Sequence, residues 1–235
     1  MTFWGGLKYT YRESWAFLWA CPLLALIPVL AEFAQHAAEM HLGMYASVEA
    51  AQAAENDPLR MAFGFIKTFA LSLPGYWVIR YLARNRDTQA ARSFDRRSVT
   101  LYAVVMLFNS ALVALQLFVL PRSGTALIAG MVAGLLITPL LLRWFVAAPL
   151  GIFISPAASA RVMLPQVPFA IAFSLAVMLP LMVPHYALGA AAIFAPAYAL
   201  KWAILIADSL LVGWMATAMM AGSWVLATRK MPITA

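Results

Sequence analysis

Long apolar runs separated by short polar segments follow one another along the whole chain. An α-helix needs about 20 apolar residues to cross the roughly 30 Å hydrocarbon core of a bilayer. Six runs approach or exceed that length, so the pattern predicts an all-α, polytopic transmembrane helical bundle in a single membrane domain over residues 1–235. The predicted spans are residues 15–35, 61–82, 99–120, 124–142, 167–184 and 202–228.

Two further apolar stretches do not fit this pattern. Residues 144–160 contain Pro149 and Pro156, which interrupt a helix, and residues 186–200 follow the fifth span without a clear polar break. Each stretch is interfacial, re-entrant or an additional span. The sequence leaves these alternatives open.

Composition supports lipid as the solvent for much of the chain. Hydrophobic residues make up 64% and charged residues 11%, whereas about 25% charged residues is usual in soluble domains. A single membrane domain accounts for the length of the chain, so a separate soluble catalytic domain is not expected. Cys21 is the only cysteine, which excludes an internal disulfide and a cysteine-based metal cluster.

The net charge of +7 reflects membrane orientation better than nucleic-acid binding. Lysine and arginine concentrate in cytoplasmic loops of membrane proteins. With the N-terminus inside, twelve of these residues fall on the cytoplasmic side, and only Arg60, Arg122 and Lys201 fall outside. Both termini are therefore predicted to be cytoplasmic. Arginine outnumbers lysine twelve to four in this alanine-rich chain, which favours a bacterial protein of the inner membrane.

Ionisable residues within spans are the first candidates for function, because an unpaired charge in hydrocarbon is costly. Lys67 and Asp208 each lie seven residues into an inward-running span, a descent of about 10 Å at 1.5 Å per residue. Equal depth predicts an ion pair between them. Lys201 lies two helical turns before Asp208 on nearly the same face and competes as its partner. The pair is either structural or part of a proton or ion relay.

A second candidate lies beyond the first predicted span. Glu32, His36 and Glu39 are spaced i, i+4 and i+7, which places them on one helix face, and His41 and His185 fall on the same side of the membrane. Carboxylates and imidazoles together can bind Zn, Fe or Mn. However, residues 36–41 match no zinc-protease signature. We therefore expect a solvated interfacial helix and no bound metal or cofactor.

Small residues at four-residue spacing let membrane helices approach closely. They are Ala126, Gly130 and Gly134 in the fourth span, and Gly213, Thr217 and Ala221 in the sixth. Packing within one bundle explains this spacing, and the alternative is a homo-oligomer or protein partner bound through Gly130, Gly134 and Gly213. Asn109, near the middle of the third span, is expected to bond to a neighbouring helix.

One local stretch, RWFVAAPLGIFISPAASARVML at residues 143–164, is both basic and proline-bearing. Together with the amphipathic start and the six spans, it resembles a six-helix bacterial membrane domain that accompanies some glycerophosphodiester phosphodiesterases and also occurs alone. The resemblance covers most of the chain in layout. It implies the fold and an association with lipid, and it carries over no catalytic residue.

The sequence contains no nucleophile elbow, phosphate-binding loop, zinc-protease motif or aspartate-rich cluster. This favours a non-enzymatic membrane protein that binds a membrane partner or lipid as an accessory, assembly or scaffold subunit. The alternative is a small transporter or channel component whose polar path includes Lys67, Asp208 and Asn109. Membrane lipids are the expected partners, and nucleic acid is not.

Overall fold

The computed structural model describes residues 1–120 and 124–233, and every regular element in those ranges is helical. The longer helices are α1 (Phe3–Ala20), α2 (Pro22–His41), α4 (Pro58–Ser72), α5 (Gly75–Ala83), α7 (Arg96–Ala114), α8 (Gly124–Ala147), α10 (Val167–Phe194) and α11 (Tyr198–Thr228). The shorter elements are α3 (Val48–Ala54), α6 (Thr88–Arg92), the π-helix η1 (Leu115–Val119), the 3₁₀ helices η2 (Ala148–Leu150) and η3 (Leu164–Gln166), and α9 (Pro156–Met163).

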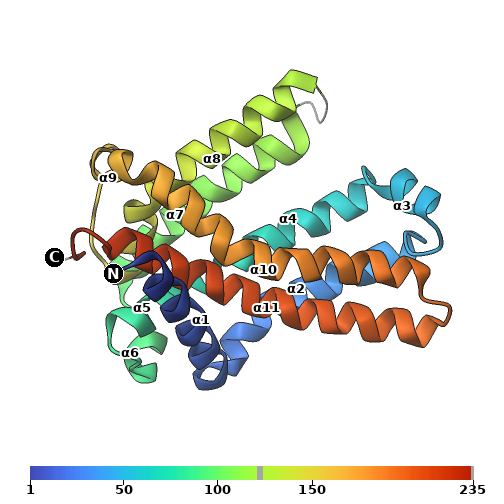
Figure 1. The fold of residues 1–235 in the computed structure, drawn as a ribbon, viewed down its shortest axis with the longest axis horizontal. Coiled ribbons are helices and arrows are strands. Elements are labelled where there is room, and N and C mark those ends of the chain that lie inside the picture. The colour runs from blue at the N-terminus through green and yellow to red at the C-terminus, as the bar shows by residue number, and fades with distance from the viewer. Residues whose placement is uncertain (121–123, 234–235) are drawn as a thin grey trace.

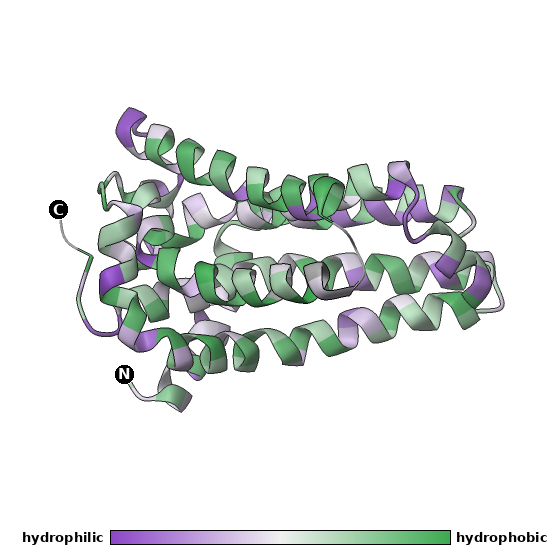
Figure 2. Cartoon of the chain, turned by 90° about the horizontal axis from the view of Figure 1, so that it is seen from above, coloured by the Kyte–Doolittle hydropathy of each residue, from purple (hydrophilic) through white to green (hydrophobic). Residues whose placement is uncertain are grey.

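Six helical segments are long and apolar enough to cross a membrane, which confirms the predicted all-α fold class. They are Pro22–His41, Pro58–Ala83, Arg96–Val119, Ile128–Leu150, Pro156–Phe194 and Tyr198–Thr228. Figure 2 shows hydrophobic residues along the middle of the long helices, with hydrophilic residues mainly toward the two ends. Arg122, predicted to lie outside the membrane, is beyond the described residues.

The first apolar segment begins later than the sequence pattern predicts. Cys21 has a non-helical backbone (φ −137°, ψ 56°), and Pro22 begins a new helix, where its missing N–H is no loss. The predicted span at 15–35 is therefore divided between α1 and α2. As a consequence, Glu32 and His36 lie inside the apolar helix α2 and not beyond its end.

Both ambiguous apolar stretches are resolved in the structure. Helix α10 accommodates Pro180 and Pro184 and continues to Phe194, so most of residues 186–200 extends the fifth and sixth segments. Residues 144–160 contain the end of α8, a turn at Gly151 with φ +73°, and the start of α9. Neither stretch forms an additional span.

Helices α2, α10 and α11 run beside one another along the long axis of the molecule, and α7 and α8 form a hairpin that leans away from them (Figure 1). Helix α11 supplies the largest share of the core. The N- and C-termini lie at the same end, near α5 and α6, while α3 lies at the opposite end (Figure 1).

Gly213 of α11 packs within the chain. A Cβ atom at this position would lie only 2.5 Å from Cγ2 of Val29 and 3.4 Å from the carbonyl oxygen of Ala25, both on α2. This close approach supports the bundle-packing interpretation for Gly213. An oligomer contact through Gly130 and Gly134 stays a prediction.

A buried carboxylate joins α1 to the turn after α5. The Glu13 side chain is 3% exposed and accepts two hydrogen bonds from Arg86, at 2.8 and 2.7 Å, and one from Arg12 at 2.9 Å. Burial alone would raise the pKa of Glu13, but these hydrogen bonds and the two positive charges outweigh it and lower the pKa.

Candidate functional site

Four polar side chains on one face of α2 form the centre of a buried network. Glu32, Gln35, His36 and Glu39 have exposed fractions between 1% and 6%, although α2 is otherwise apolar. Their spacing of three and four residues places them above one another along the helix. The prediction of a solvated interfacial helix is therefore wrong, because α2 runs between α4 and α11 and both neighbours cover this face.

The ring of His36 is bonded on both nitrogens. Its Nδ1 lies 3.1 Å from Oε2 of Glu39 and 2.9 Å from the hydroxyl of Tyr45. Its Nε2 lies 3.0 Å from Oδ2 of Asp208 and 3.4 Å from Oε1 of Glu32. Ionised carboxylates only accept hydrogen bonds, so beside ionised Glu39 and Asp208 both ring nitrogens donate and His36 is an imidazolium.

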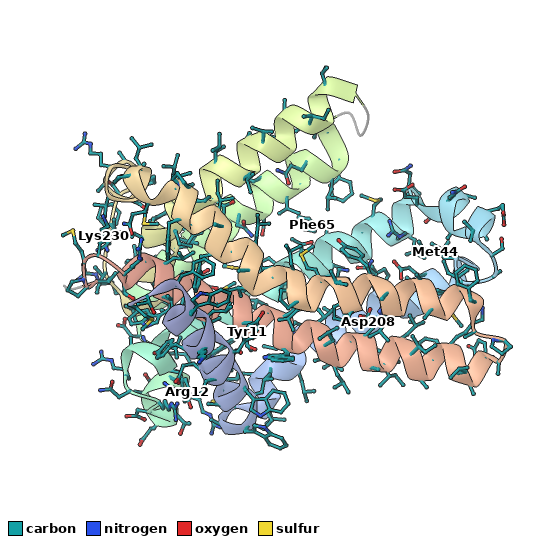
Figure 3. All side chains as sticks on the ribbon, in the orientation of Figure 1. Tyr11, Arg12, Met44, Phe65, Asp208 and Lys230 are labelled. Carbon is teal, nitrogen blue, oxygen red and sulfur yellow. The ribbon has the colours of Figure 1, made fainter. Side chains whose placement is uncertain are left out.

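Asp208 is the most deeply buried member and joins three helices. Its side chain, on α11, is fully buried where the helices run along the long axis of the molecule (Figure 3). Nδ1 of His185, on α10, lies 2.7 Å from Oδ1, and Nε2 of His36, on α2, lies 3.0 Å from Oδ2. Each carboxylate oxygen of Asp208 thus has an imidazole partner from a different helix.

Lys67 pairs with Glu32 and not with Asp208. Nζ of Lys67 lies 3.1 and 3.3 Å from the two carboxylate oxygens of Glu32. The predicted Lys67–Asp208 ion pair is therefore wrong. Depth along a span gives the level of a charge but not its direction around the bundle, and α2 lies between the two helices, so each residue meets a partner on α2.

Lys201 is also not a partner of Asp208. Its Nζ donates hydrogen bonds to the carbonyl oxygen of Tyr45 and, at 3.3 Å, to that of Ile193. These carbonyls belong to the loop after α2 and to the end of α10. Lys201 therefore binds the loop after α2. It lies two helical turns from Asp208, the partner that the sequence offered for it.

Glu39 links the network to that loop. The hydroxyl of Tyr45 donates to Oε2 of Glu39 at 2.6 Å, and Nε of Arg60 donates to Oε1 at 3.1 Å. Gln35 donates to Oε1 at 2.8 Å. Burial and the negative charge of Glu39 raise the pKa of Tyr45 well above its usual value, so its hydroxyl stays protonated as a donor.

The charges of the network cancel. Three carboxylates, Glu32, Glu39 and Asp208, face three cations, Arg60, Lys67 and protonated His36. Buried ions are tolerated when each has a partner and its remaining hydrogen-bonding capacity is filled. The network therefore connects α2, α4, α10 and α11 through paired charges, although Oε2 of Glu32 has only the ammonium of Lys67 beside it and accepts no hydrogen bond.

Three of these residues also form a potential metal-binding set. Glu32, His36 and Asp208 each present a ligand atom, and the three atoms lie within 4.8 Å of one another. The sequence singled out Glu32, His36 and Glu39 instead. Glu39 instead contacts Tyr45 and Arg60. The third potential ligand is therefore Asp208 and not Glu39, which the helical spacing had suggested.

The sequence found part of this network and missed part of it. The spacing of Glu32, His36 and Glu39 identified the correct face of α2, and Asp208 was recognised as an intramembrane charge. Gln35 shares that spacing but was not predicted, because it carries no charge, and Tyr45 was not predicted, because it lies in the loop after α2 and gives no local signal. His41, noted beside His185, is exposed and stands apart from the network.

A separate apolar cavity of about 270 Å³ lies among α4, α5, α7, α8, α10 and α11. Its wall includes four methionines, Met106, Met178, Met219 and Met220. Asn109 also lines this cavity, where its Nδ2 donates a long 3.4 Å hydrogen bond to Oγ of Ser72. Asn109 therefore belongs to a different site from Lys67 and Asp208.

Comparisons of the chain with protein-family models, curated proteins and solved structures found no match.

Proposed function

We propose that this protein is a non-enzymatic integral membrane protein that binds lipid and acts as an accessory, assembly or scaffold subunit. The apolar cavity is the observation that carries the proposal. Its volume of about 270 Å³ is close to the lower end of the roughly 300–1,000 Å³ range of small-molecule sites.

The lining of the cavity suits an acyl chain. Methionine side chains are unbranched and adapt to irregular apolar shapes, and four of them contribute to the wall. Ser72 and Asn109 supply only a few polar atoms, enough to contact an ester or hydroxyl group near the chain. Because the lining helices include membrane-spanning segments, lipid is the apolar ligand present at the highest local concentration.

Exposed arginines at the end near the termini fit the same function. Arg80, Arg86 and Arg92 are bonded to other parts of the chain. Arg84, Arg96 and Arg97 are exposed. Near an anionic leaflet, each such residue contributes about 1 kcal/mol of attraction. These three arginines would therefore draw anionic lipid to the cytoplasmic surface of the protein.

Two adjacent valines of α7 give a matched test of lipid binding. Val105 is 4% exposed and lines the cavity, whereas Val104 is 51% exposed on the other side of the helix. We expect Val105→Phe to reduce the lipid that copurifies in mild detergent and Val104→Phe to leave it unchanged. Lipid per protein is measured by native mass spectrometry. Equal lipid content in both variants would contradict binding in the cavity.

A transporter or channel component is the second candidate function, and the buried network favours it, because intramembrane ionisable residues often mark ion pathways. Asp208→Asn removes one charge from the network with little change of shape. Ion flux in proteoliposomes distinguishes the two functions. A transporter loses flux in this variant, whereas a lipid-binding subunit shows no flux to lose and retains its copurifying lipid.

The proposed location is the bacterial inner membrane, with both termini and residues 84–97 in the cytoplasm. Both termini and α6 lie at one end of the bundle, and residues 47–57 lie at the other (Figure 1). Accessibility tags at the termini and within residues 84–97 should all report the cytoplasm, and a tag within residues 47–57 the opposite side. A cytoplasmic report from residues 47–57 would contradict this topology.

A further inference from the structure

Three ligand atoms from two helices converge on one point inside the buried network. Nε2 of His36 lies 3.0 Å from Oδ2 of Asp208 and 3.4 Å from Oε1 of Glu32. All three residues are at most 3% exposed. In a tetrahedral site with bonds of about 2.0–2.2 Å, neighbouring ligand atoms are about 3.3–3.6 Å apart. The two separations to Nε2 are close to that spacing, and the three ligand atoms all lie within 4.8 Å of one another.

The hydrogen bonds at this point are incomplete. The single proton on Nε2 of His36 faces carboxylate oxygens from both Asp208 and Glu32. In addition, the buried Oε2 of Glu32 accepts no hydrogen bond, although Nζ of Lys67 lies 3.1 Å away. A buried carboxylate oxygen without a hydrogen bond is costly. A metal cation between the three side chains would bond Oε1 of Glu32 and Oδ2 of Asp208 directly, in place of one shared proton.

The surrounding residues already hold two of the ligands in position. Oε2 of Glu39 lies 3.1 Å from Nδ1 of His36, which leaves Nε2 directed toward Asp208 and Glu32. A carboxylate bonded to the second nitrogen of a metal-binding histidine is the usual supporting arrangement at zinc sites. His185, 2.7 Å from Oδ1 of Asp208, fixes that carboxylate in the same way.

The charge of the network also accommodates a metal ion. A divalent cation at this point replaces the proton on Nε2 of His36, so the network changes by only one positive charge. Lys67, 3.1 Å from Oε2 of Glu32, then stays as the cation beside the metal-bound carboxylate. One imidazole and two carboxylates form a ligand set that suits Zn²⁺, Mn²⁺ or Fe²⁺.

The geometry points to an intramembrane binding site for one divalent transition-metal ion, formed by Nε2 of His36 and the carboxylates of Glu32 and Asp208. Three protein ligands leave a fourth position for water or another ligand. This site is independent of lipid binding in the apolar cavity, which is lined by different residues.

Zinc binding to the purified full-length protein tests the site. After treatment with a chelator, the protein in detergent is titrated with ZnCl₂, and bound metal is counted by mass spectrometry. We expect one Zn²⁺ per chain and a higher melting temperature. Asp208→Asn and His36→Gln should each weaken binding at least about tenfold. His41→Gln, which removes an exposed histidine outside the site, should leave binding unchanged.

Cobalt spectroscopy uses the unmodified protein, so its result does not depend on whether the variants fold. Co²⁺ in this site should give the visible absorption of a four-coordinate nitrogen and oxygen environment, and Zn²⁺ should displace it. No stoichiometric binding to the unmodified protein, or unchanged binding in Asp208→Asn and His36→Gln, would overturn the proposal. Lipid content measured in the same samples reports separately on the proposed function.

Discussion

Asp208 and Glu13 are both buried carboxylates, but the protein neutralises them in different ways. Asp208 lies inside a spanning segment and is bonded by two histidines, whose side chains are only 4% and 13% exposed. Glu13 lies in α1, outside the spanning segments, and its partners Arg86 and Arg12 are 48% and 66% exposed. The partners of Asp208 are thus desolvated with it, whereas those of Glu13 keep much of their contact with water.

This difference predicts how strongly each carboxylate contributes to stability. Removing one member of a desolvated ionic network leaves its partners buried without compensation, which typically costs about 3–5 kcal/mol. Pairs with solvent-exposed partners usually contribute about 0–1 kcal/mol, because water and salt screen them. The network around Asp208 should therefore dominate, and the cluster around Glu13 should respond more to salt and pH.

The largest expected effect is that of Asp208→Leu. It leaves His36 and His185 without their shared acceptor, so we expect the free energy of unfolding to fall by about 3–5 kcal/mol. Leu210→Ala, at a side chain that is 57% exposed on the same helix, is the control and should have a much smaller effect. Unfolding in detergent is followed by circular dichroism. Equal losses in both variants would contradict a special role for Asp208.

The next effect is the coupling of Lys67 to Glu32. A double-mutant cycle with Lys67→Met and Glu32→Gln should give a coupling energy of about 0.5–3 kcal/mol, because these side chains are in direct contact. The same cycle with Lys67→Met and Asp208→Asn should give a smaller value. A larger coupling energy between Lys67 and Asp208 would contradict this assignment and support the ion pair that equal depth predicted.

A smaller, pH-dependent effect is expected at Glu13. Its pKa is lower in the folded protein than the ordinary value of 4.5, so its contribution is present above that value and is lost as the pH falls through the lowered pKa. Arg86→Gln should cost about 1 kcal/mol at neutral pH and less in high salt. Arg84→Gln, at a neighbouring exposed arginine, is the matched control.

Glu13→Gln completes this test. The variant cannot lose a proton from position 13, so it should lose less stability than the unmodified protein between about pH 5 and pH 3. Thermal unfolding across that range measures the difference. The same loss of stability in both proteins would place the acid sensitivity at another carboxylate.

The smallest expected effect is that of Asn109→Leu, which removes a polar but uncharged group. Its hydrogen bond to Ser72 is 3.4 Å long, beyond the usual range, and lies at an apolar cavity. We expect a change of less than about 0.5 kcal/mol in unfolding free energy. A loss as large as that of Asp208→Leu would show that uncharged polar groups matter as much as the ionic network.

The sequence by itself predicted the all-α fold and six apolar segments, because the length and hydropathy of a spanning helix are local properties. It also identified Asp208 and the polar face of α2, because an ionisable residue in an apolar run and a helical spacing can both be read locally. It predicted a first span beginning at residue 15, because the apolar run is continuous there, whereas the structure divides this run at Cys21 and Pro22.

Only the tertiary structure decided which charges meet. Lys67 and Asp208 are charged residues within apolar segments, as the sequence indicated, but α2 lies between their helices. Lys67 therefore contacts Glu32, and Asp208 contacts His36 and His185. The rotation of each helix and the order of helices around the bundle follow from packing between segments far apart in sequence. The depth of a residue along its helix can be estimated from the sequence, whereas the direction in which its side chain points around the bundle cannot.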